Sequence, residues 1–255
     1  MIIDAHGHIG PWENGEITPE YVIQLMDEAG INLSIISNLG GVGRYTDQNP
    51  PNQQTLQAVR SYPARLRGSV WVNPWKGELA IQNTRMCLEL PGKEFVGLKF
   101  HPYLNAFHFN SEFIKPFVRL AQEFDAPLAV HTAYDEFSHP DEVVAVALQP
   151  EFKGAKFILY HAGLGAPDFE SGEAVFRQVA QQNNLYIDIS WLNMDRLKLA
   201  LELIPIEQIL YGTDVPLGGP DHYQEYSAKI AALELSKEER IKLMEVNARN
   251  IFKRL

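Results

Sequence analysis

The sequence lacks most features of secreted, membrane-spanning and nucleic-acid-binding proteins. It has a single cysteine, Cys87, so no disulfide can form within the chain. No run approaches the roughly 20 apolar residues of a membrane span. No basic segment followed by an apolar one stands at the start, so we expect a cytoplasmic protein without a secretory signal. The net charge is −10 and the sequence has no basic cluster. We therefore expect that the protein binds neither nucleic acid nor an anionic membrane.

Short β-branched runs alternate with amphipathic segments along the whole chain. Strands are predicted at residues 1–6, 32–39, 67–74, 95–102, 127–132, 156–163, 184–190 and 208–214. Helices are predicted at residues 19–30, 78–90, 111–124, 141–149, 173–184, 194–205 and 236–255. Parallel strands need such crossovers, so the pattern predicts an α/β fold, a single (β/α)₈ TIM-barrel domain spanning 1–255. A doubly wound sheet would be expected to carry a Gly-rich phosphate turn after the first strand, where the chain reads HIGPWENGE.

One stretch, NLGGVGRYTDQNPPNQ (residues 38–53), is rich in glycine and proline. It does not match a nucleotide-binding fingerprint. We expect a long loop here, either a lid over a site or a mobile connection.

Polar side chains gather at the carboxyl ends of the predicted strands, where TIM barrels carry their active sites. They are His6, His8, Lys99, His101, His131, His161, Asp188, Ser190 and Asp214. Strand alternation predicts that His6 and His8 share a face with Asp4, which lies nearer the barrel floor. Any one of these histidines alone would suit a structural role. Four buried histidines and an aspartate without a common partner would be costly, and a divalent cation satisfies them together. Imidazole and carboxylate ligands suit zinc, with manganese, iron and cobalt as alternatives.

The motifs then show a family resemblance over the whole chain. DAHGH, GLKFHP, AVHT, YHAG and YGTDVP occur in order, with YPARLRGSVWVNP before the third strand and NARNIF near the end. This set resembles the amidohydrolase superfamily, specifically the amidohydrolase-related (amidohydrolase 2) family of metal-dependent TIM-barrel hydrolases and decarboxylases. The resemblance implies that the metal ligands are His6, His8, His131 and Asp214. It also implies that Asp214 acts as general base, and that His161 binds a second metal or hydrogen-bonds the attacking water or the substrate.

Lys99 stands where two-metal relatives carry a carboxylated lysine that bridges the metals. The decarboxylase-like branch usually has one metal and leaves this position to the substrate, and we favour one ion over two. An unmodified ammonium beside a cation would need to turn away or pair with an anionic substrate. Other candidates for substrate contact are Arg44, Tyr103 and His101. Of these, His101 shares a strand face with Lys99. Asp188 is a candidate for orienting a ligand histidine.

The predicted function is hydrolysis of a small lactone, amide or ester by a metal-activated water. The main alternative is a metal-dependent decarboxylase of an aromatic or unsaturated carboxylic acid, which would share the fold and the metal ligands. A third alternative is a non-catalytic metal-binding barrel. The chain is short and has no long insertions to close over a bulky substrate, which favours hydrolysis of a small molecule. Homodimers and homotetramers are common among relatives, so a homo-oligomer is possible by analogy.

Overall fold

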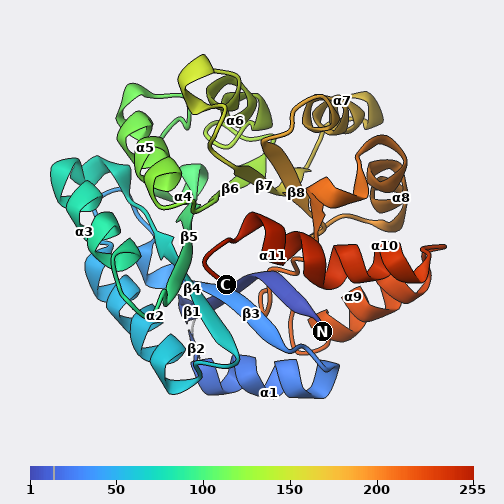
Figure 1. Cartoon of the computed structure of the whole chain (residues 1–255), viewed down its shortest axis with the longest axis horizontal. Coiled ribbons are helices and arrows are strands. Elements are labelled where there is room, and N and C mark those ends of the chain that lie inside the picture. The colour runs from blue at the N-terminus through green and yellow to red at the C-terminus, as the bar shows by residue number, and fades with distance from the viewer. Residues whose placement is uncertain (14) are drawn as a thin grey trace.

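Nine strands form the centre of the molecule in a computed structural model that describes residues 1–13 and 15–255 (Figure 1). The strands are β1 (Ile3–Trp12), β2 (Gly15–Ile17), β3 (Leu33–Asn38), β4 (Leu66–Trp71), β5 (Phe95–Phe100), β6 (Leu128–Ala133), β7 (Phe157–Leu164), β8 (Leu185–Asp188) and β9 (Ile209–Leu210). Strand β2 pairs antiparallel with β1, and every other neighbouring pair is parallel.

The segment after β9 closes the sheet into a barrel. Gly7 bridges to Val215 in parallel. The backbone N–H of His8 donates to the Val215 carbonyl at 2.9 Å, and that of Asp214 donates to the His6 carbonyl at 2.8 Å. The last strand segment therefore lies beside the first, which confirms the predicted TIM-barrel fold.

Helices surround the strands on the outside (Figure 1). They are α1 (Pro19–Ala29), α2 (Asn49–Ser61), α3 (Glu78–Leu88), α4 (Pro102–Asn105), α5 (Lys115–Glu123), α6 (Pro140–Ala147), α7 (Phe169–Ala180), α8 (Met194–Leu203), α9 (His222–Ala231), α10 (Lys237–Ile241) and α11 (Asn247–Ile251). None of the described helices is long and apolar enough to cross a membrane.

The expected long loop at 38–53 is shorter than predicted. Helix α2 begins at Asn49, and its prolines lie in the first turn, where a missing N–H costs nothing. The part before it is tied down, because the side-chain amide of Asn73 donates to the carbonyls of Gly43, Arg44 and Thr46. This stretch is a hydrogen-bonded turn followed by a helix.

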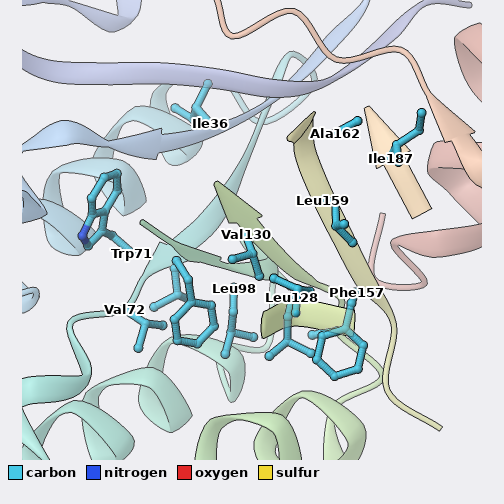
Figure 2. Packing of buried hydrophobic residues seen from close by; sticks show 14 of the residues in the cluster. Ile36, Trp71, Val72, Leu98, Leu128, Val130, Phe157, Leu159, Ala162 and Ile187 are labelled. Carbon is cyan, nitrogen blue, oxygen red and sulfur yellow. The ribbon is translucent and has the colours of Figure 1, made fainter. Parts of the chain in front are cut away.

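Among the described residues, two apolar clusters stabilise the barrel. The larger lies between strands and helices; Figure 2 shows Leu98, Leu128 and Phe157 pointing from their strands toward the helices. The smaller draws side chains from β1, β3, β5, β6, β7 and β9, and Phe252, which follows α11, packs into it. Because the terminal helix α11 covers this inner cluster, the opposite end of the barrel, at the carboxyl ends of the strands, is left for the polar side chains (Figure 1).

Irregular register aims several of those polar side chains. The pairing of β1 with β3 shifts between Asp4 and Gly7, so strict alternation does not hold there. The carboxylate of Asp4 accepts hydrogen bonds from Ser34, Thr213 and the hydroxyl of Tyr223 on α9. The prediction that Asp4 shares a face with His6 and His8 is therefore wrong, while its structural role is in keeping with these bonds.

Candidate metal centre

Three side chains from the two ends of the chain converge at the mouth of the barrel. The Asp214 Oδ1 atom lies 3.0 Å from His6 Nε2 and 2.9 Å from His8 Nε2, and the two nitrogens are 3.2 Å apart. All three side chains are buried. Their ligand atoms lie within 4.8 Å of one another, the arrangement of a divalent metal site.

Further hydrogen bonds orient both imidazoles of this cluster. His6 Nδ1 lies 2.8 Å from the Asp188 carboxylate, and His8 Nδ1 lies 3.1 Å from the hydroxyl of Ser37. Each contact occupies the nitrogen that points away from Asp214, so each ring presents Nε2 to the shared centre. Carboxylate–histidine contacts of this kind orient metal-binding histidines and set their tautomer.

Burial and charge place His8 and Asp214 in the protonation states of metal ligands. Burial lowers the pKa of His8 to about 4, so its imidazole is neutral near pH 7. Burial alone would raise the pKa of Asp214, but the facing His6 and His8 hold the pKa of that carboxyl well below its usual range. A carboxylate and neutral imidazoles are the forms that bind a divalent ion.

His161 belongs to a second group that meets the first at His6. Ligand atoms of His6, His161 and Asp188 also lie within 4.8 Å of one another. Positive φ angles at His161 (67°) and Ala162 (47°) break the alternation of β7. Both Tyr160 and His161 therefore lie beside His6, with ring centroids at 3.6 Å and 5.1 Å. Left-handed conformations are strained in residues other than glycine, and here they occur at the site.

His131 and His101 form one wall of the same cavity. Their rings stack at 3.8 Å, and the His131 ring meets that of His161 edge-on at 4.7 Å. Burial lowers the pKa of His131 to about 3 and lowers that of His101 well below its usual range. Among the described residues, the compact metal-ligand groups do not include His131. It lies near the centre but outside the tightest set.

Lys99 is buried against the metal-ligand cluster. Its Nζ lies 3.2 Å from His6 Nε2 and 4.3 Å from the ring centroid of Tyr160. Burial lowers the pKa of the ammonium to about 8, so it is still mainly protonated at pH 7. In the described part of the chain no carboxylate lies within ion-pair distance of it, so a bound anion would give this ammonium a partner.

A cavity of about 260 Å³ lies over the cluster. Its polar lining consists of His8, Lys99, His101, His131, His161 and Asp214. Its apolar lining consists of Trp12, Leu39, Leu104, Leu164, Trp191 and Leu217. The volume is below the roughly 300–1,000 Å³ of pockets for drug-sized ligands, which fits a single-ring molecule.

Two of the residues predicted to contact substrate lie outside this lining. Arg44 is exposed, and its guanidinium stacks at 4.0 Å on the ring of Trp75. Tyr103 is 53% exposed on α4. Neither is among the described residues that line the cavity, whereas Lys99 and His101 both are.

The structure also reveals contacts that sequence reasoning missed. The indole Nε1 of Trp191, which is not among the predicted site residues, donates to Asp214 Oδ2 at 2.6 Å. The hydroxyl of Ser190 lies 2.8 Å from His161 Nδ1. Asp188 and Ser190 are two residues apart in the predicted strand at 184–190, and this spacing is a sequence signal that the two side chains share a face. No sequence pattern links Trp191 to Asp214. The backbone of Trp191 has a positive φ of 59°, so strand alternation does not predict where its side chain points.

Comparison with known proteins extends these observations. A family model described as amidohydrolase matches residues 3–254. No curated protein matches the chain.

Several solved structures share the fold over nearly the whole chain. A 4-oxalomesaconate hydratase from Rhodopseudomonas palustris has a TM-score of 0.76 and 19% identity, covering 100% of this chain and 96% of that one. A 2,6-dihydroxybenzoate decarboxylase from Rhizobium has a TM-score of 0.76 and 18% identity, covering 99% and 98%. A dihydroxybenzoic acid decarboxylase from Polaromonas sp., with bound manganese and the inhibitor 2-nitroresorcinol, has a TM-score of 0.74 and 19% identity, covering 99% and 96%.

Proposed function

The chain belongs to the amidohydrolase family, and on that premise we propose that it is a metal-dependent decarboxylase of a small hydroxy-aromatic acid. The carrying observation is the cluster of His6, His8 and Asp214 opening onto a small cavity with apolar walls. Similar folds named as decarboxylases favour this function over the hydrolysis expected from the sequence.

The donor set suits one divalent ion. His6, His8 and Asp214 would hold it, and His131 and His161 line the space beside it. Buried neutral imidazoles and a carboxylate suit zinc or manganese, the latter being bound in the Polaromonas structure. When bound, such an ion would hold the substrate's carboxylate and neighbouring hydroxyl oxygen and withdraw charge from them.

The chain's own residues would carry the proton transfer. Asp214, exchanging protons with water at the cavity mouth, would deliver one to the ring carbon that bears the carboxylate. A C–H bond forms there with a ring electron pair, the bond to the carboxylate breaks, its pair returns to the ring, and carbon dioxide leaves. The Trp191 indole donates to Asp214 Oδ2 and would hold this carboxylate in place. His161 faces the cavity, where its ring can bond the substrate hydroxyl.

The cavity also indicates the charge of the substrate. Lys99 is the one cationic lysine or arginine among the described lining residues, and its Nζ lies beside His6. Half of the lining, including Leu164 and Leu217, is apolar. A second carboxylate there would lose its hydration without a partner. We therefore propose an aromatic acid with a single carboxylate.

A product assay tests the proposal. Protein loaded with manganese or zinc is incubated with 2,6-dihydroxybenzoate and related hydroxybenzoates, and released carbon dioxide and the phenol are quantified. Asp214→Asn should reduce the rate by at least about 100-fold, the range for a lost acid–base group. The matched control is Asp168→Asn, since Asp168 is the exposed N-cap of α7 and asparagine also caps helices.

Two results would contradict the proposal. One is turnover of lactones, esters or amides, or addition of water, with no carbon dioxide released from any aromatic acid. The other is an Asp214→Asn variant as active as the Asp168→Asn control.

A further inference from the structure

The segment Asp188–Trp191 at the end of β8 contacts three residues of the proposed centre. Asp188 Oδ2 lies 2.8 Å from His6 Nδ1, and Ser190 Oγ lies 2.8 Å from His161 Nδ1. Asp188 and Ser190 are both buried with no measurable exposure, and the proposed reaction gives neither of them a step.

The Asp188 carboxylate receives donors from several sides. The backbone N–H of His161 donates to Oδ1 at 2.8 Å, which also holds the left-handed turn of that residue. Ser190 Oγ lies 2.8 Å from both Oδ1 and Oδ2. An ionised carboxylate only accepts hydrogen bonds, so the hydroxyl proton of Ser190 must point to Asp188.

This proton count determines how the two histidines are protonated. With its only proton directed at Asp188, Ser190 can only accept from His161, so Nδ1 of His161 carries the hydrogen. The same carboxylate requires a hydrogen on Nδ1 of His6. A histidine that binds a metal ion is neutral, so in His6 the other nitrogen, Nε2, then has a free lone pair for the ion that would lie between it and Asp214. In a neutral His161, Nε2 likewise has a free lone pair.

We propose that Asp188 and Ser190 are positioning residues that hold His6 and His161 in the Nδ1–H tautomer. The unprotonated Nε2 of His6 then faces His8 and Asp214 as a metal ligand, and that of His161, which lines the cavity, serves as a hydrogen-bond acceptor for the substrate hydroxyl. The role of His161 rests on the proposed function, whereas its tautomer depends only on the buried contacts.

The test combines a spectroscopic and a kinetic measurement. In zinc-loaded protein labelled with ¹⁵N-histidine, the His161 signals, assigned with His161→Asn, should show a protonated Nδ1. In Ser190→Ala they should show a mixture with the Nε2–H tautomer. The kcat of Ser190→Ala should fall about 10-fold, as for other lost partners of site histidines. KM should change less than twofold, and Ser190→Thr, which keeps the hydroxyl, should recover most of kcat.

Ser69→Ala is the matched control, because Ser69 Oγ is buried on β4 and, among the described residues, has no hydrogen-bond partner. It should leave the His161 signals and kcat unchanged. A wild-type His161 protonated at Nε2, or identical His161 signals in Ser190→Ala, would overturn the proposal. A wild-type protein with the expected tautomer but no carbon dioxide release would instead overturn only the decarboxylase function.

Discussion

Acidification should destabilise the metal-free protein through its buried histidines. His8 and His131 are held in surroundings that lower their pKa values from 6.5 to about 4 and about 3. In the unfolded chain they regain ordinary values. On acidification from pH 7.5 to 5.0 these two histidines therefore take up protons in the unfolded state but stay neutral in the folded state. The free energy of unfolding falls as a result.

The magnitude follows from the two pairs of pKa values. Between pH 7.5 and 5.0, His8 and His131 each remove about 2 kcal/mol of folding free energy. Asp4 acts in the opposite direction, because burial raises its pKa from 3.8 to about 6 and its folded carboxyl takes up protons first. Protonation of Asp4 stabilises the folded state by about 1 kcal/mol, so the three groups together lower the free energy of unfolding by about 3 kcal/mol. That is a large share of the roughly 5–15 kcal/mol that stabilises a typical domain.

Urea unfolding followed by tryptophan fluorescence, in the presence of a chelator, measures this effect. Wild-type protein and His131→Gln are compared at pH 7.5 and pH 5.0, with a sample returned to pH 7.5 as the control for reversibility. The variant should lose about 2 kcal/mol less than the wild type on acidification. Equal unfolding midpoints at the two pH values with an unchanged m-value, or the same loss in both proteins, would refute the reasoning.

Two further predictions concern the cavity. Trp191→Phe keeps an aromatic side chain but removes the hydrogen-bond donor to Asp214 Oδ2, and it should lower kcat or metal affinity about 10-fold. Steady-state kinetics and metal titration measure the two quantities. If neither changes, the indole contributes only packing. Leu164→Arg places a guanidinium in the apolar part of the cavity lining. It should raise the kcat/KM of a hydroxy-aromatic dicarboxylate about 10-fold relative to that of the monocarboxylate, because a hydrogen bond to a charged group contributes roughly 1.5–3 kcal/mol. A dicarboxylate preference in the wild type would contradict the single-carboxylate substrate.

Local sequence patterns determined the fold and the family. The alternation of short β-branched runs with amphipathic segments predicts the parallel strands and most of the helices around them, because strand and helix periods are properties of neighbouring residues. The capping box of Ser236 and Glu239, which starts α10, is of the same kind. The patterns do not predict the helices at Asn49–Ser61 and His222–Ala231; in the former, the first turn contains prolines within a stretch that otherwise favours a loop.

Only the tertiary structure decided which polar side chains meet and what each one faces. His6 and Asp188 are 182 residues apart and come together because the strands lie side by side in a closed barrel. The shift in β1 that turns Asp4 away from His6, and the stacking of Arg44 on Trp75 outside the cavity, have no local signature. Residue types and their spacing predict which chemistry is available, but direction depends on register, backbone turns and packing between distant segments, which exist only once the barrel has closed.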